Sequence, residues 1–167
     1  CTMSGVAYIT IGGWIASRFN TADLDALVDR FRDAPAMILD VRMNGGGDDV
    51  LAFSFAGRFA TANTVLGYIQ FRNGPRHDDF GPETTRTIGP RGSFQFTRPV
   101  IVLSGRGVYS SNESFVSAMR ELPNVTILGD TTGGATANPV ERELGDGWKF
   151  TVSRWIERTA DHRVIEW

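Results

Sequence analysis

The sequence is poor in the residues on which disulfide, metal and lysine chemistry depends. Its 167 residues include one cysteine, Cys1, and two histidines, His77 and His162. A single cysteine excludes an internal disulfide and a cysteine-built metal site, and two histidines exclude most histidine-based metal cages. Lys149 is the only lysine, because 16 of the 17 basic residues are arginines. Arginine keeps its proton at neutral pH, so a lysine-dependent mechanism would have to use Lys149.

Long apolar runs and an excess of one charge are absent as well. No stretch approaches the roughly 18 consecutive apolar residues of a transmembrane helix, so we expect no membrane span. The net charge is −2 and the basic residues are scattered, which argues against nucleic acid as the main partner. Apolar residues make up 41% of the chain. We therefore expect residues 1–167 to form one globular core domain, within the usual size of roughly 100–200 residues.

Strand-like and helix-like patterns alternate along the chain, which is typical of an α/β fold. Residues 67–98 are polar and rich in Gly, Pro and Arg, and we interpret them as a long loop or insertion, with a strand at Val65–Phe71 where it begins. Three helices are predicted: one that begins at a cap formed by Asn20 or Thr21, one over Val50–Phe59 and one over Ser110–Leu122. The other predicted strands are Val6–Ile11, Ala36–Val41, Pro99–Leu103, Val125–Leu128 and Trp148–Val152.

Three consecutive glycines follow the second predicted strand, in the segment Asp40–Gly47 (DVRMNGGG). Glycines let the backbone approach a ligand and leave N–H groups exposed. A phosphate loop fits poorly, because Asp48 and Asp49 would repel a polyanion and no Gly-Lys-Ser/Thr ending follows. An oxyanion hole suits the glycines better, since its negative charge is transient. The structural alternative is a tight strand-to-helix turn.

A second motif, Ser110–Glu113 (SSNE), follows the strand predicted at Pro99–Leu103. A serine at a helix start is usually an N-cap, and Glu113 completes a capping box with Ser110. The helix N-terminus also favours the negative charge that develops at a nucleophile and its substrate oxygen. Capping and nucleophilic attack are compatible for adjacent serines. The motif differs from the Gly-x-Ser-x-Gly elbow of α/β-hydrolases.

These two motifs and Gly129–Gly134 (GDTTGG) carry a family resemblance. In order and spacing they resemble the tail-specific (C-terminal processing) serine peptidase superfamily, which includes the tricorn protease core and the interphotoreceptor retinoid-binding protein modules. The resemblance runs from about Val6 to Trp167. It implies a crotonase-like ββα spiral of the kind found in the Clp protease subunit, incomplete at both ends here and without a PDZ domain in this chain.

The resemblance also implies roles for individual residues. Ser110 takes the position of the nucleophile. The oxyanion N–H groups would come from Ser111 and from the glycine turn, where we favour Gly46 over its neighbour Gly47. The supporting residues around this centre would be Asp40, Arg42, Asn44 and Glu113, and Glu166 takes the position of the family's catalytic glutamate.

The general base departs from the Ser–Lys branch of the superfamily. That branch places a lysine 25 residues after its serine, where this chain has Ala135, and Lys149 lies in a predicted exposed strand. The segment resembles instead the tricorn and retinoid-binding branch, whose base is a histidine upstream of the stretch equivalent to Val6–Ile11. We therefore expect the base to be missing from this chain, with His77 and His162 as solvated surface residues.

The resemblance favours a serine endopeptidase core that acts without a cofactor or metal on extended peptides or protein tails. Many relatives are exported, so we expect a periplasmic or cell-envelope location, and a homo-oligomer is possible. A non-catalytic ligand- or peptide-binding module on the same fold is the alternative. Its apolar cavity would be lined by Trp14, Phe53, Phe55 and Trp148, although ordinary core is the simpler interpretation. Acyl-CoA chemistry fits less well beside Asp48 and Asp49.

Overall fold

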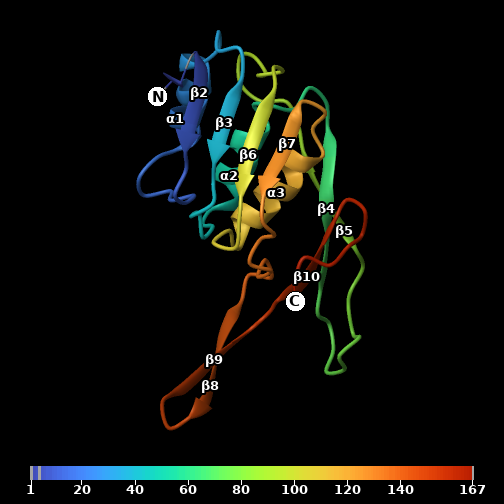
Figure 1. Cartoon of the computed structure of the whole chain (residues 1–167). Helices are drawn as coiled ribbons and strands as arrows, with labels where there is room; N and C mark the ends of the chain where they lie inside the picture. Colours follow the sequence, from blue (N-terminus) through green and yellow to red (C-terminus); the bar gives the residue numbers. More distant parts are fainter. Residues whose placement is uncertain (1, 4, 167) are drawn as a thin grey trace.

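The main sheet of the protein contains the strands that flank both motifs. The computed structural model describes residues 2–3 and 5–166. The strand order in this sheet is β1-β2-β3-β6-β7 (Figure 1), and β1 alone is antiparallel to its neighbour. The five strands are β1 (Thr2–Met3), β2 (Val6–Thr10), β3 (Met37–Asp40), β6 (Val100–Ser104) and β7 (Val125–Gly129).

Three helices form a layer behind this sheet (Figure 1), so the predicted α/β class is confirmed. Two of them begin at side-chain caps. Asn20 accepts hydrogen bonds from the first turn of α1, and Asp48 does the same for α2, which satisfies N–H groups that a helix start otherwise leaves unpaired. The helices are α1 (Thr21–Arg30), α2 (Asp49–Ala56) and α3 (Ser111–Arg120).

An aromatic cluster fills the core between the sheet and the helices. The Trp14 ring lies 5.0 Å from Phe115 and 5.9 Å from Phe55, centroid to centroid. Trp14 and Phe55 are buried and Phe53 packs against the core, so the simpler interpretation of these aromatics is confirmed. For Trp148 it is wrong, because this side chain is 73% exposed on a hairpin outside the core.

A second, antiparallel sheet has the order β10-β4-β5. It consists of β4 (Thr64–Phe71), β5 (Thr84–Ile88) and β10 (Trp155–Thr159). The strand predicted at Val65–Phe71 is confirmed, and the long loop predicted over residues 67–98 is interrupted by β5. The segment TTRTI of β5 has one apolar residue, the buried Ile88, while Arg86 is mostly buried and the three threonines are exposed. Such a strand lacks the alternating apolar pattern that would reveal it.

A two-stranded hairpin projects away from both sheets (Figure 1). It consists of β8 (Val140–Gly145) and β9 (Trp148–Val152). The strand predicted at Trp148–Val152 is confirmed as β9, whereas its partner β8 was not predicted. No helix within the described residues is both long enough and apolar enough to cross a bilayer.

Candidate active site

The glycine turn and the serine motif meet beside the main sheet. They follow β3 and β6, which pair in parallel with Asp40 opposite Leu103. A Cβ atom added to Gly46 would lie only 2.8 Å from Ser110 Cβ and 2.8 Å from the Tyr109 carbonyl oxygen. A Cβ atom essentially never lies so close to another heavy atom, so glycine at position 46 is what lets the turn contact Ser110.

Ser110 has a backbone conformation that is unusual for a residue with a side chain. Its φ is 55° and its ψ is −133°, a region that glycine occupies readily and that costs other residues about 1–3 kcal/mol. Ser110 is the N-cap residue of α3, and Glu113 forms the predicted capping box with it. Ser110 also lines a small cavity of about 120 Å³, together with Gly47, Ser114 and Thr136.

Glu113 fixes the backbone around Ser110. Its buried carboxylate accepts hydrogen bonds from the N–H groups of Ser110 at 3.1 Å, Gly134 at 2.7 Å and Ala135 at 2.8 Å. The Ser110 N–H also reaches the Ala135 carbonyl oxygen at 3.2 Å. Bonds to a charged acceptor are about twice as strong as neutral ones. Glu113 therefore ties the serine to the loop that follows β7.

Two backbone N–H groups beside Ser110 are unpaired in the described part of the chain. Within residues 5–166, those of Gly47 and Ser111 have no hydrogen-bond acceptor. The N–H of Gly46 is engaged, because it donates to Asn44 Oδ1 at 2.8 Å. This hydrogen bond occupies the N–H that we favoured as an oxyanion donor. The free N–H groups belong to the other two residues that the sequence indicated.

Asp40 and Arg42 brace the end of β3 at a distance from the cavity. Asp40 accepts from Arg42 Nε at 2.9 Å and Nη2 at 2.7 Å, and from the Tyr8 hydroxyl at 2.6 Å. These hydrogen bonds, those from Arg42 above all, hold the pKa of Asp40 well below its ordinary value. Neither side chain lines the cavity at Ser110, so the pair supports the turn without facing a ligand there.

Asn112 holds three segments of the site together, although the sequence gave no indication of this role. Its buried side chain donates to the carbonyl oxygens of Val41 at 3.2 Å and Asn44 at 3.1 Å, and accepts from Trp14 Nε1 at 3.1 Å. Asn112 belongs to the SSNE motif, so its position was known. Its partners were not, because they lie 68 to 98 residues away along the chain.

A buried charge network beside the cavity was also missed. Arg86 on β5 donates to Glu157 of β10 at 2.9 Å and to Asp49 of α2 at 2.7 Å, and Ser114 donates to the same Glu157 oxygen at 2.7 Å. Burial raises the pKa of Glu157, and the adjacent Arg86 opposes that rise. Because these residues come from four separate elements, no local sequence pattern could group them.

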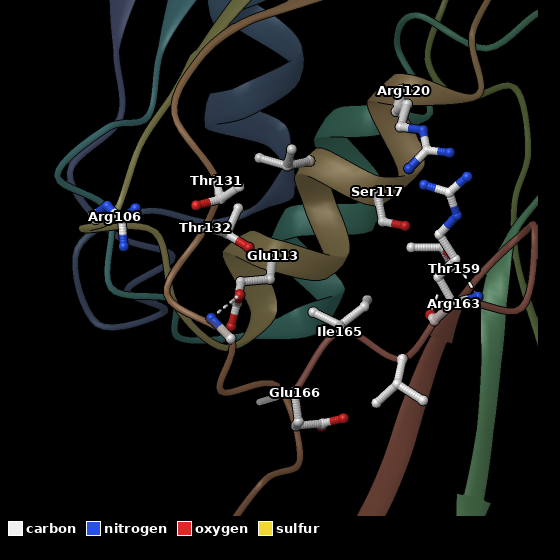
Figure 2. Close-up of a pocket in the computed structure, with 13 residues that line it drawn as sticks. Arg106, Glu113, Ser117, Arg120, Thr131, Thr132, Thr159, Arg163, Ile165 and Glu166 are labelled. Carbon is white, nitrogen blue, oxygen red and sulfur yellow. Dashed lines mark hydrogen bonds between the residues drawn. The ribbon is translucent and has the colours of Figure 1, made fainter.

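Glu166 is separated from the cavity by one hydroxyl group. Its carboxylate accepts from the Thr136 hydroxyl and from the Glu157 N–H at 3.3 Å, and Thr136 lines the cavity with Ser110. Glu113 and Glu166 also both line a larger cavity of about 610 Å³ between α3 and the C-terminal segment (Figure 2).

No histidine or lysine of the described chain lines the cavity at Ser110. His77 is exposed, and His162 stacks on the Tyr68 ring at 4.3 Å with Nδ1 3.7 Å from Glu83 Oε2. Lys149 forms a surface ion pair with Glu141 at 2.7 Å. Within residues 2–3 and 5–166, no group of three or more His, Cys, Asp or Glu side chains is placed to hold a metal ion.

Known proteins are similar to this chain in sequence and in fold. The chain is 30% identical over 136 residues to the carboxy-terminal processing protease CtpA of Bacillus subtilis, covering 80% of this chain and 27% of that protein. A solved structure from Parabacteroides merdae is 33% identical, with a TM-score of 0.89 over 97% of this chain and 51% of that one. The structure of mature CPAF with lactacystin matches in fold, with a TM-score of 0.85 at 11% identity over 96% of this chain and 45% of that one.

The chain thus spans about a quarter of its curated relative and about half of the solved structures. The model of peptidase family S41 matches residues 5–166, which include both motifs, the cavity at Ser110 and Glu166. Since this match extends over nearly the whole sequence, the chain belongs to peptidase family S41.

Proposed function

We propose that this chain is the core of a serine endopeptidase in which Ser110 is the nucleophile. The observation that carries the proposal is the position of Ser110 on a small cavity, in contact with a glycine turn. The free N–H groups of Gly47 and Ser111 would hold the oxyanion that forms when the Ser110 hydroxyl attacks a peptide carbonyl. Each such donor contributes about 10²–10³ to the rate of comparable enzymes.

The proton of the Ser110 hydroxyl must pass to a base. Position 135 is an alanine and no histidine lines the cavity, so we propose that the base comes from a part of the protein outside this chain. Glu166 would orient that base, because its carboxylate reaches the cavity through the Thr136 hydroxyl. Orientation of a base by a buried carboxylate is the usual third element of such sites.

The substrate that suits this site is an extended peptide or a protein tail. The name of the Bacillus subtilis relative, a carboxy-terminal processing protease, supports the second of these. We further propose that the parallel sheet and its helices represent the ββα spiral of the crotonase-like fold, and that the chain is one core domain. The proposed spiral places the serine at the start of α3, where the helix dipole favours developing negative charge.

A fluorophosphonate probe tests the nucleophile, and the expected result is labelling of the intact protein at Ser110. Ser110→Ala should abolish the labelling. Ser111→Ala is the matched control, because its hydroxyl is buried without a partner among the described residues and its N–H is retained. Labelling that persists in Ser110→Ala, or disappears only in Ser111→Ala, would contradict the proposal.

A non-catalytic binding module remains the second candidate. The absence of a lysine or histidine from the cavity lining favours it. Under this alternative the intact protein would bind a peptide at the cavity without being labelled or cleaving it. The two candidates therefore differ in a single measurement, the covalent reaction of Ser110.

A further inference from the structure

We propose that the hairpin β8–β9 is a docking strand for the substrate polypeptide. An extended substrate segment would pair with the free edge of β8, and its apolar side chains, at every second position, would extend the face of the hairpin that carries Trp148, Phe150 and Val152. This inference rests on the proposed function, because it provides the path by which an extended chain reaches Ser110.

The hairpin starts and ends at the cavity that contains Ser110. The segment leading into β8 passes Ser110, whose N–H donates to the Ala135 carbonyl oxygen, and Asn138 of this segment lines the cavity. The chain returns from β9 through Arg154, whose N–H donates to the Ala137 carbonyl oxygen at 2.9 Å, and then reaches Trp155, another lining residue. A chain lying along β8 is thereby led to the nucleophile.

The two faces of the hairpin differ in character. The register places Val140 opposite Val152 and Arg142 opposite Phe150, so these residues share one face with Trp148. On this face Trp148 is 73%, Phe150 41% and Val152 38% exposed. The opposite face is charged and carries the ion pair between Lys149 and Glu141. Contiguous exposed apolar side chains of this kind mark interaction sites.

The edge of β8 is open for main-chain pairing. The sheet has two strands, and within the described residues β8 pairs only with β9. On the other side of the hairpin base, the Arg154 carbonyl oxygen accepts from Arg72 N–H at 3.3 Å. An isolated hairpin is marginally stable in water, and a third strand supplies both hydrogen bonds and apolar cover. We therefore assign the added strand to β8.

The charges on β8 favour a substrate strand over a second copy of this chain. A two-fold pairing of β8 with its own copy, with both apolar faces on the same side, places one residue of β8 directly opposite itself. In the three central registers this residue is Glu141, Arg142 or Glu143. Like charges in directly opposed positions destabilise a sheet. A substrate strand with neutral polar residues between its apolar ones avoids this repulsion.

The first test measures binding by the Ser110→Ala variant of the intact protein, which separates docking from catalysis. The probe is a fluorescein-labelled eight-residue peptide that alternates Val and Thr, followed by fluorescence anisotropy. The double substitution Trp148→Ser and Phe150→Ser should weaken binding about tenfold or more. The matched control, Lys149→Ser with Thr151→Ser on the charged face, should change binding less than about twofold, since exposed ion pairs contribute little. Equal effects of the two pairs would overturn the proposal.

The second test changes the peptide and leaves the protein unaltered. Two series of peptides carry methyl groups on alternate backbone nitrogens, so that each series lacks the N–H donors of one edge of the peptide strand. Because only one edge would pair with β8, the two series should differ about tenfold or more in affinity. Two series that both bind as tightly as the unmethylated peptide would overturn the proposal. Sedimentation velocity measures whether the hairpin substitutions convert a dimer to a monomer. That conversion, with peptide binding unchanged, would overturn the proposal and indicate that a second copy of this chain pairs with the hairpin. The fluorophosphonate result at Ser110 is independent of all these outcomes.

Discussion

At the scale of single residues, the candidate site is held by side chains that bind backbone groups. Glu113 accepts three N–H groups, and Asn112 joins Trp14 to the turn after β3. The glycines of that turn contribute by having no side chain. Gly47 has a φ of 136°, and a Cβ atom there would lie 2.1 Å from the Trp14 carbonyl oxygen. The position of its free N–H therefore depends on glycine.

Gly47→Ala is expected to displace this N–H from Ser110. The strained φ alone should lower the free energy of unfolding by about 1–3 kcal/mol, and the rate of Ser110 labelling should fall by about 10²–10³ if one oxyanion donor is lost. Gly45→Ala is the control, because a Cβ atom at Gly45 has no neighbour within 4 Å. It should change stability by less than about 0.5 kcal/mol. Denaturant unfolding and labelling kinetics measure both effects, and similar results for the two variants would refute the assignment.

At the scale of elements, the network of Arg86 joins α2, α3, β5 and β10 around the cavity. Arg86 and Glu157 are almost completely buried, so each compensates the other's charge where water cannot. Removing one member of such a pair leaves an uncompensated buried charge, which costs about 3–5 kcal/mol. Burial raises the pKa of Glu157 in the folded protein. The Glu157 carboxyl therefore contributes stability at low pH, and this contribution is lost as the pH rises through the pKa of Glu157 in the folded protein.

Arg86→Leu should therefore destabilise the protein in a pH-dependent way. We expect a loss of about 3–5 kcal/mol at pH 7 and a smaller loss near pH 4, where Glu157 can take up a proton and needs no counter-charge. Adding Glu157→Gln should recover much of the stability at pH 7 and flatten the pH dependence. Unfolding free energies of the three proteins across this pH range test the prediction. A loss that is the same at pH 4 and pH 7 would refute it.

The elements that the sequence predicted correctly are those with a regular apolar pattern. The strands at Ala36–Val41 and Pro99–Leu103 are almost wholly apolar, consist of buried and half-buried residues, and appear as β3 and β6. Strands β5 and β8 escaped prediction because most of their side chains are polar and exposed. Ser110, Ser111 and the glycines were found because their motifs are contiguous. Arg86 and Glu157, 71 residues apart, become neighbours only through the tertiary structure.

At the scale of the whole molecule, stability is distributed unevenly between the α/β layers and the hairpin. Strands β3 and β6 contain fully buried residues such as Leu39 and Val102, whereas every residue of β9 is exposed. The strands of the hairpin contact each other, and their open edges face solvent. Regions with few buried apolar contacts open at a low free-energy cost, so the hairpin should be the more dynamic part.

Hydrogen exchange should make this difference visible. We expect the amides of β8 and β9 to exchange on the order of 10²-fold faster than those of β3 and β6, because the hairpin opens without disturbing the core. Mass spectrometry of peptic fragments of the intact protein measures both regions in one experiment. Adding the Val and Thr peptide to Ser110→Ala should slow exchange in β8 in particular. Equal protection of the hairpin and the core sheet in the free protein would contradict this expectation.

The backbone of Ser110 has a consequence for how this protein responds to selection. At φ 55° and ψ −133°, glycine would fit position 110 with less strain than serine does. A laboratory population selected for heat tolerance alone would therefore gain by discarding the hydroxyl. A population selected for peptide cleavage would keep the strained residue and accumulate compensating changes elsewhere.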